Sequence, residues 1–354
     1  MKILIVDPYY PGVLEAHYRS RPDLAGQSYD TQWRALMDLA FGTSDAYSFG
    51  LRAAGHEGHE IVPNCAPLQR AWAREHRPRL ARLPWRLAAP AILVEQAAWY
   101  QPDVVYVQSI GAFHPLTLRL LRRRTNALAG QLASRPPQKE RVRMYDVLFT
   151  SFPHFVGRLP VPTHLLRIGF DDRVLQRIDA KEKRYDVVFV GQLGGGEHGP
   201  ANDVLEAAAA HVPVEVWGPG LDDRSERSPF RTRHHGVVWG IEMLRVLAGS
   251  RIALNRHIAA AEGHANNMRL FEATGVGAML LTDAARGLDT LFEPDREVVT
   301  YTSAGDLVEK ARWYLEHEDE RAAIAAAGHA RTLSDHTYVA RMRELVSILK
   351  RYVS

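Results

Sequence analysis

Short runs of consecutive apolar residues alternate with helix-forming segments along this chain, and the alternation limits the folds it can adopt. A strand without polar positions has both faces buried, so such runs favour parallel strands covered by helices on either side. Strand, helix and strand in repeated order predict an α/β fold with right-handed crossovers. The runs are Ile3–Val6, Val104–Val107, Val147–Phe149, Val187–Val190, Val214–Trp217, Ile252–Leu254 and Ala278–Leu281, with helical segments such as Asp203–Ala210 and Met243–Ala248 between them.

The alternation restarts near the middle of the chain. A proline-rich break at 159–162 and a charged stretch at 179–184 precede a new strand that ends at Gly191. At 354 residues the chain is also too long for one compact core of typical size. We therefore expect two α/β domains with a boundary within 160–184. Tandem domains of this kind place a cleft between them, and their ligands bind at the carboxyl ends of the strands.

The last segments are predicted to be helical. Ser303 and Asp306 form a capping box that should open one helix. Gly328 is expected to end the next helix, and a final helix is expected from about Tyr338.

Composition excludes several classes of protein. Cys65 is the only cysteine, which argues against a disulfide scaffold and a cysteine-based zinc site. No apolar stretch is long enough to span a bilayer, and the first residues form a strand rather than a signal peptide, so a cytoplasmic protein is expected. The glycines at 191–196 lack the spacing of a dinucleotide-binding loop.

The most informative stretch is Asn266–Asp283. It predicts a helix from about Asn267 to Thr274, a glycine turn and a buried strand, with Asn266 or Asn267 as the helix cap. The amides of the first turn and Arg269 would bind an anion, while Glu272 on nearly the same face would accept hydrogen bonds from a ribose. The alternative is an Arg–Glu pair on a solvated helix with ordinary turn glycines.

Six stretches in the second half, in this order, resemble those of the CgeB-like (spore-maturation-type) branch of the group 1 glycosyltransferases, which have the GT-B fold. The resemblance covers roughly 185–350 and rests on Tyr185–Gly191, Val214–Gly218, His235–Val238, Ser250–Asn255, Arg269–Ala273 and His336–Arg341.

The resemblance implies an α/β GT-B fold with two Rossmann-like domains facing across a cleft. The expected limits are an acceptor-binding domain over 1–165, a linker over 166–184, a nucleotide-sugar-binding domain over 185–335, and a C-terminal helix over 336–354 that crosses back to the first domain.

The resemblance also implies roles for particular residues. Glu272 would hold the ribose, and the turn at Asn267 and Met268, together with Arg269, would hold the diphosphate. Asn255 to His257 would face the donor sugar or the phosphates. The complete set of expected donor-binding residues is Gly191 and Gln192 under the diphosphate, Trp217 in the second strand, His235, Gly236 and Val237 at the base, and Asn255, Arg256, Asn267, Met268, Arg269 and Glu272.

Two departures from the family pattern favour other hypotheses. Many relatives carry an acid eight positions before the residue that matches Glu272, where this chain has His264. Relatives also carry a basic residue soon after the turn that matches Gly191, whereas 192–200 has no Arg or Lys, and His198, Arg256 or Arg269 would have to supply that charge. The alternatives are a non-catalytic sugar-nucleotide or glycan-binding protein and a sugar-nucleotide epimerase.

Sugar transfer with inversion needs a base from the first domain. His114 is the first candidate because it follows the end of a strand, and Asp30 and His17 are the others. For each of them a structural role at the surface or in a turn is the alternative. The aromatic residues Tyr9, Tyr10, Tyr18, Tyr29 and Trp33 are expected either to stack on an acceptor or to belong to the core.

A cluster of arginines lies between Arg70 and Arg86, near Trp72 and Trp85. It predicts either a solvated helical face, broken at Pro78 and Pro84, or peripheral contact with anionic lipid or with an acidic acceptor. Nucleic-acid binding is not expected, because the net charge is only +3 and no recognised motif accompanies the arginines.

The sequence thus predicts a glycosyltransferase of the hexosyltransferase type. Because no Asp-x-Asp occurs, no metal is expected. No permanently bound cofactor is expected either, and the co-substrate would be a UDP-, GDP- or dTDP-sugar. A glycan, a metabolite, a protein and a lipid-linked sugar all remain open as the acceptor. The expected location is the cytoplasm, with a peripheral position at the inner face of the membrane as the alternative.

Overall fold

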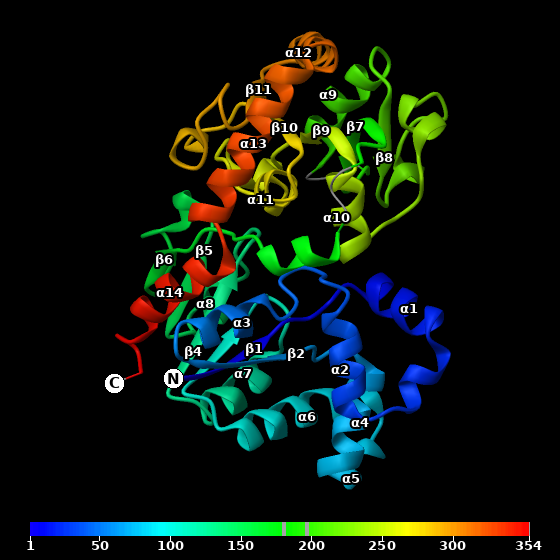
Figure 1. Cartoon of the computed structure of the whole chain (residues 1–354). Coiled ribbons are helices and arrows are strands. Elements are labelled where there is room, and N and C mark those ends of the chain that lie inside the picture. Colours follow the sequence, from blue (N-terminus) through cyan, green and yellow to red (C-terminus); the bar gives the residue numbers. More distant parts are fainter. Residues whose placement is uncertain (179–181, 195–197, 354) are drawn as a thin grey trace. The chain divides into compact units, whose positions relative to one another are not determined.

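The computed structural model describes residues 1–178, 182–194 and 198–353. The chain divides into two compact units (Figure 1). The first unit consists of Met1–Arg167 together with Tyr338–Ser354, and the second of Ile168–Thr337. Each is built on one parallel sheet flanked by helices, which confirms the predicted α/β class. The expected features at 179–181, within the charged stretch, and at 195–197, within the glycine-rich loop, lie outside the described residues.

The first unit has a six-stranded parallel sheet in the order β2-β1-β3-β4-β5-β6. Its strands are β1 (Lys2–Val6), β2 (Glu57–Ile61), β3 (Val104–Val107), β4 (Ala127–Leu132), β5 (Val147–Thr150) and β6 (Thr163–Leu165). Its helices are α1 (Pro11–Ser20), α2 (Tyr29–Met37), α3 (Ala46–Ala53), α4 (Ala66–His76), α5 (Pro78–Ala81), α6 (Trp85–Tyr100), α7 (Pro115–Arg122), α8 (Lys139–Val142) and α14 (Tyr338–Leu349). As expected, Pro78 and Pro84 interrupt the arginine-rich segment between α4, α5 and α6.

Both faces of this sheet are buried. Ile3 and Ile5 of β1 pack in one core with α3 and α14, while Leu4 and Val6 pack in another with α6 and α7. The continuous apolar runs follow from this two-sided burial.

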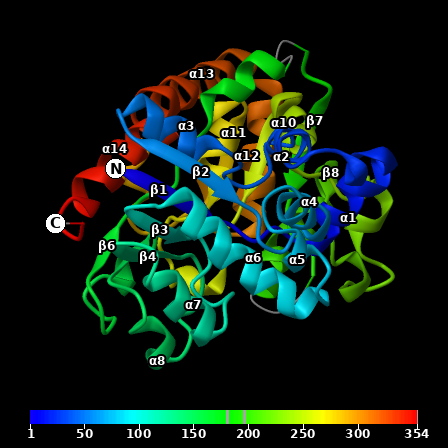
Figure 2. The same cartoon turned by 90° about the horizontal axis from the view of Figure 1, so that it is seen from below.

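The C-terminal helix α14 packs against α3, as predicted, and Figure 2 shows the two side by side. Gly50 of α3 permits this close packing, because a Cβ there would overlap the side chain of Met342 and the carbonyl oxygen of Tyr338.

The second unit has a five-stranded parallel sheet in the order β11-β10-β9-β7-β8. Its strands are β7 (Tyr185–Val190), β8 (Val214–Trp217), β9 (Ser250–Asn255), β10 (Met279–Asp283) and β11 (Val299–Tyr301). Its helices are α9 (Gly199–Ala209), α10 (Gly240–Ala248), α11 (Met268–Gly275), α12 (Ala304–Glu316) and α13 (Glu318–Asp335).

Two predictions about the last helices had different outcomes. The Ser303 hydroxyl accepts a hydrogen bond from the Asp306 amide (3.2 Å) and caps α12, so that prediction is confirmed. The prediction that Gly328 ends a helix is wrong, since α13 continues to Asp335. Gly328 is required instead by packing, because a Cβ at this position would overlap the backbone carbonyl of Glu297.

Candidate functional site

The candidate site lies at the carboxyl edge of the second sheet. Because the strands are parallel, β7, β8, β9 and β10 all end at this edge, at Val190, Trp217, Asn255 and Asp283 respectively. The segment after β9 leads into the N-terminus of α11 at the same edge. The expected donor-binding residues all lie at these strand ends, in the loops that follow them, or in α11.

The turns after β7 and β8 lie in direct contact. The Gly191 amide donates a hydrogen bond to the Trp217 carbonyl (2.9 Å), and the Gly218 amide donates one to the Gly236 carbonyl (2.9 Å). Gly218 has φ +149°, and a Cβ there would overlap the carbonyl oxygen of Gly191. Glycine is therefore required at 218, because it lets the turns after β7 and β8 approach each other closely.

Arg256 braces the turn after β7. Its Nε donates to the Asn202 side chain (2.6 Å), and its Nη2 donates to the Gln192 carbonyl (3.0 Å). Asn202 Nδ2 donates in turn to the carbonyls of Gln192 (3.0 Å) and Gly194 (3.1 Å). Burial lowers the pKa of Arg256 to about 10. The guanidinium of Arg256, the residue directly after β9, thus lies against the turn after β7, whose own sequence has no Arg or Lys.

The start of α11 is tied to the ends of β9 and β10. Asn267 Oδ1 accepts a hydrogen bond from the Leu270 amide (3.2 Å), which confirms Asn267 as the cap. Asn267 Nδ2 donates to Asn255 Oδ1 (2.8 Å), and Asn255 Nδ2 donates to Thr282 Oγ1 (2.9 Å). The amides of Met268 and Arg269 have no acceptor within the helix, so this helix start is suited to an anion.

Arg269 and Glu272 form an ion pair at 2.9 Å, and their side chains are only 13% and 14% exposed. Arg269 Nη2 also donates to the Val190 carbonyl at the end of β7 (3.0 Å). Burial raises the pKa of Glu272, and the Arg269 charge opposes that shift. The two residues do pair, but in a largely buried place beside the turn at Gly191 rather than on a solvated face.

An aromatic shelf lies at the end of β8. The rings of Trp217 and His235 are stacked, with centroids 4.6 Å apart and planes at 23°. Glu215 accepts hydrogen bonds from the side chains of His235 and Arg233. Burial alone would raise the pKa of Glu215, but these hydrogen bonds outweigh burial and hold the pKa below its usual range. Val237, two residues after His235, is exposed.

The structure adds a His–Asp pair at the same edge. His257 Nδ1 donates to Asp283 Oδ1 (2.7 Å), and the His257 amide also donates to the carboxylate (3.0 Å). His257 is 6% exposed, and its Nε2 has no hydrogen-bond partner within the described part of the chain. His257 belongs to the range Asn255 to His257 that was expected to face the donor sugar or the phosphates, whereas Asp283 was not among the expected residues. The signal was available, since the two residues follow or end neighbouring strands.

His264, which stands where many relatives have an acid, lies before α11. Its amide donates to the Ala261 carbonyl (2.9 Å), and it forms a bridge with Arg286.

In the first unit the predicted catalytic candidates lie in separate places. His114 is exposed and caps α7, with its Nδ1 accepting from the Leu116 amide (3.2 Å). Asp30 is exposed on α2 and pairs with Arg34 (3.0 Å). His17 is buried on α1, and burial lowers its pKa to about 4. Each thus has a local structural environment, and a catalytic role for any of them stays a prediction.

The predicted aromatic residues of the first unit are mostly in its core. Tyr9 is buried with Phe41, and Tyr18, Tyr29 and Trp33 pack against the same cluster. Tyr10 is the exception, with an exposed side chain.

Two acids of the first unit were missed by sequence analysis. Asp7 directly follows β1 at the carboxyl edge of the sheet, and burial raises its pKa to about 7 despite a hydrogen bond from Thr43. Glu60 in β2 is fully buried, and burial raises its pKa to about 7 although the Ser48 amide donates to it (2.8 Å). A carboxyl group that titrates near neutrality suits general base catalysis.

Residues 1–178, 182–194 and 198–353 contain no group of three or more His, Cys, Asp or Glu side chains placed to hold a metal ion. In the same ranges, no helix combines the length and apolar character needed to cross a bilayer.

Comparison with protein families matches residues 201–347 to the family described as "Glycosyl transferase-like". No curated protein matches the chain. The matched segment contains β8 to β11 and most of the carboxyl-edge residues described above.

Experimental structures of glycosyltransferases share the fold over the whole chain. A glycosyltransferase from Rickettsia africae has 11% identity and a TM-score of 0.58, covering 100% of this chain and 98% of its own. Anabaena Alr3699/HepE, in complex with UDP-glucose, has 15% identity and a TM-score of 0.60, covering 99% and 100%. Sucrose-phosphate synthase from Thermosynechococcus elongatus has 14% identity and a TM-score of 0.56, covering 99% and 98%. The fold is therefore GT-B, as predicted.

Proposed function

We propose that this chain, whose residues 201–347 match the glycosyl transferase-like family, transfers a sugar from a nucleotide-diphosphate donor to an acceptor. The observation that carries the proposal is the capped start of α11 beside the turns at Gly191 and Gly218. Helix amides and the guanidinium of Arg269 are suited to a diphosphate.

The remaining donor contacts follow from their positions along the edge. Glu272 would accept hydrogen bonds from the ribose hydroxyls. These hydrogen bonds would replace part of its present ion pair with Arg269. The shelf of Trp217 and His235, with Gly236 and Val237, would contact the base. His257, held by Asp283, would present Nε2 to the sugar or a phosphate. The matching Anabaena structure contains UDP-glucose, so UDP-hexoses are the first donors to test, before GDP- and dTDP-sugars.

Positive charge would stabilise the leaving diphosphate as the bond to the sugar breaks. Arg269 and the α11 amides would supply that charge without a metal, in keeping with the absence of an Asp-x-Asp sequence. In an inverting reaction a carboxylate or imidazole of the first unit would remove the proton of the acceptor hydroxyl. Asp7 joins His114 and Asp30 as a candidate for this base, because it directly follows β1 at the carboxyl edge of the sheet and burial raises its pKa to about 7.

The acceptor is proposed only by class: a glycan, a metabolite, a protein or a lipid-linked sugar. We place the enzyme in the cytoplasm, with peripheral membrane contact through Arg70–Arg86. We also propose that the chain belongs to the CgeB-like branch, on the six stretches between Tyr185 and Arg341.

The first experiment is thermal unfolding of the whole chain with nucleotide diphosphates and nucleotide sugars, without metal. A ligand that binds only the native state raises the melting temperature. We expect a shift with one nucleotide, lost in Glu272→Gln, which preserves the shape of a buried side chain. Glu242→Gln is the matched control, since Glu242 pairs with Arg245 three residues away on an exposed face of α10.

Product analysis with the same donor distinguishes the alternatives. Transfer or slow donor hydrolysis supports the proposal, whereas donor binding without turnover would indicate a binding protein. Conversion of the donor to an isomeric nucleotide sugar would indicate an epimerase. A shift that persists in Glu272→Gln, or is lost equally in Glu242→Gln, would contradict the ribose assignment.

A further inference from the structure

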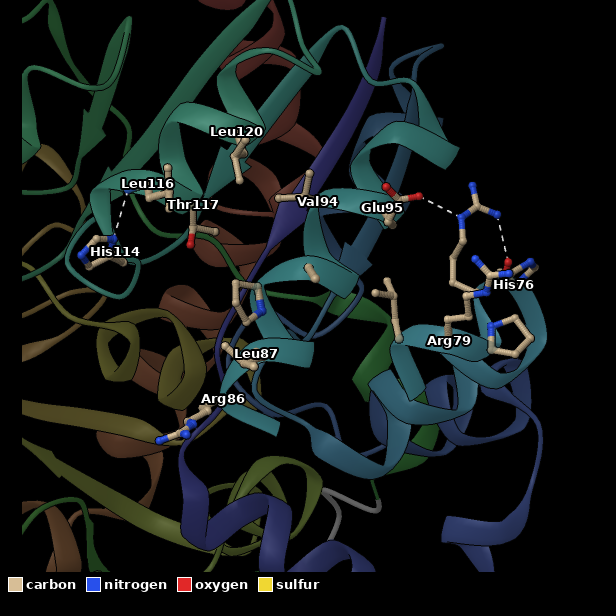
Figure 3. Close-up of a pocket in the computed structure, with 15 residues that line it drawn as sticks. His76, Arg79, Arg86, Leu87, Val94, Glu95, His114, Leu116, Thr117 and Leu120 are labelled. Atoms are coloured by element: carbon tan, nitrogen blue, oxygen red, sulfur yellow. Dashed lines mark hydrogen bonds and ion pairs between the residues drawn. The ribbon is translucent and has the colours of Figure 1, made fainter. Parts of the chain in front are cut away.

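The first unit has an open groove of about 910 Å³ between α5, α6 and α7 (Figure 3). A volume of this size is near the upper end for sites that hold organic ligands. Its wall includes Leu87 of α6 and Leu116 and Leu120 of α7. These three leucines are 55%, 58% and 37% exposed.

The two helices turn apolar faces toward the groove as well as toward the core. On α6, Leu87 and Pro90 line the groove at helical spacing, while Ile92, Leu93 and Val94 are buried, and Val94 also reaches the groove lining. On α7, Leu116 and Leu120 are four residues apart and line the groove. The opposite face of α7 packs into the core through Leu118 and Leu121. Core packing therefore does not account for the apolar groove face.

The rim of the groove is cationic. Arg77, Arg79 and Arg86 line it, and between residues 70 and 124 the chain has ten arginines and three acids. Glu95 is the only acid in the lining, and it is neutralised by Arg77 (2.8 Å). Arg79 and Arg86 are exposed, and neither has an ion pair with any carboxylate in the described residues.

We propose that this groove docks on an anionic lipid bilayer. Leu87, Leu116 and Leu120 would enter the acyl region, and Arg79 and Arg86 would contact the lipid phosphates. Arginine suits this position because its stem lies along apolar surface while the guanidinium stays at the headgroups. Each basic residue near an anionic membrane contributes attraction, and buried leucines add the apolar contribution that electrostatic adsorption lacks.

Charge complementarity favours lipid over a protein partner. A bilayer offers phosphates all round an inserted apolar patch, and the groove lining combines three exposed leucines with the guanidinium groups of Arg79 and Arg86. The inference deepens the membrane contact proposed above by naming the inserted residues, and it does not depend on the donor chemistry.

The test is flotation of the whole chain with vesicles of phosphatidylcholine alone or with about 30% phosphatidylglycerol. We expect binding to the anionic vesicles only. Leu116→Gln with Leu120→Gln should weaken binding at least tenfold, and Arg79→Gln with Arg86→Gln about tenfold. The controls are Val156→Gln, an exposed apolar residue outside the groove, and Arg19→Gln with Arg34→Gln, exposed arginines of α1 and α2.

Insertion is tested separately from adsorption. An environment-sensitive fluorophore on Leu116→Cys should shift to the blue on anionic vesicles, and the same label on Val156→Cys should not.

Several results would overturn the proposal: no binding to anionic vesicles, equal binding to neutral ones, or equal loss in the groove and control variants. Binding of an acidic amphipathic peptide in place of vesicles would also overturn it. Nucleotide-dependent melting of the same variants should stay as in the wild type, so failure here is distinguishable from failure of the donor site.

Discussion

Two side chains at the carboxyl edge of the second sheet each make two structural interactions. Asn267 caps α11 and also binds Asn255, and Arg269 pairs with Glu272 and also holds the end of β7. These two residues hold the start of α11 against the ends of β7 and β9. The first amides of α11 are left without acceptors in the helix. The proposed anion site would thus be organised before a ligand binds, which would lower the cost of binding.

His257 gives the sharpest prediction at the residue scale. Its Nδ1 is occupied by Asp283, and its buried Nε2 has no partner among the described residues, so a bound donor would satisfy it. We expect His257→Gln to reduce turnover by about 10–100-fold. Binding of the nucleotide diphosphate alone, measured by thermal shift, should remain.

His329→Gln is the matched control, because His329 is a partly buried histidine that bonds only a backbone carbonyl, that of Gly275, in the second unit. Equal losses of turnover in the two variants would show that His257 supports the fold rather than the sugar.

At this scale the sequence indicated which residues of the second unit lie together, and their roles in donor binding stay a prediction. Gly191, Trp217, Asn255 and Glu272 were selected from stretches that resemble a family, and each ends a strand, follows one or belongs to a helix that follows one. His114 also follows a strand, yet it caps α7 at an exposed position. His114 differs from the residues of the second unit in its burial. Burial depends on contacts between segments that are distant in the sequence, so the sequence alone does not reveal it. The same holds for Asp7 and Glu60, whose raised pKa values result from burial.

At the scale of elements, apolar runs predicted β1, β3, β5, β7, β8, β9 and β10. β4 was missed because its residues, Ala-Leu-Ala-Gly-Gln-Leu, include helix formers and a glycine. Gly130 is needed there, since a Cβ would crowd Ile110 and Tyr145. β11 is only three residues long. Strands of this kind are specified by the neighbours they pair with, and those are not visible along the sequence.

A substitution at Gly328 tests how closely α13 packs against the backbone at Glu297. Glycine to alanine within a helix normally stabilises by up to about 1 kcal/mol. In α13 we expect the opposite, a loss of about 1–3 kcal/mol, because the new methyl group would overlap the Glu297 carbonyl. Urea unfolding of Gly328→Ala measures the change.

The control is Gly305→Ala in the first turn of α12, where the nearest atom to a new Cβ is Ser303 Oγ at 3.9 Å. Its stability should be unchanged or slightly increased. If Gly328→Ala behaves like this control, then α13 is not packed closely against Glu297.

At the scale of the whole chain, the first unit is discontinuous. Residues 1–167 are completed by 338–354, whereas the second unit is one continuous segment. The two crossings lie close together, since the Phe170 amide donates to the His336 carbonyl within the second unit (2.7 Å). The core of the first unit therefore depends on α14, which is separated from the rest of that unit along the chain and buries Met342 and Leu345 against α3 and the sheet.

Met342→Ala tests this dependence. Met342 is fully buried, so the variant should lose about 2–5 kcal/mol of stability. Because the loss falls on the first unit alone, we expect the nucleotide-dependent shift of the second unit to persist while an earlier unfolding transition separates from it. Arg343→Ala, exposed on the same helix, should leave the melting curve unchanged. A Met342→Ala protein that melts in one transition with its nucleotide shift abolished would mean that the two units do not unfold separately, and that the donor site depends on α14.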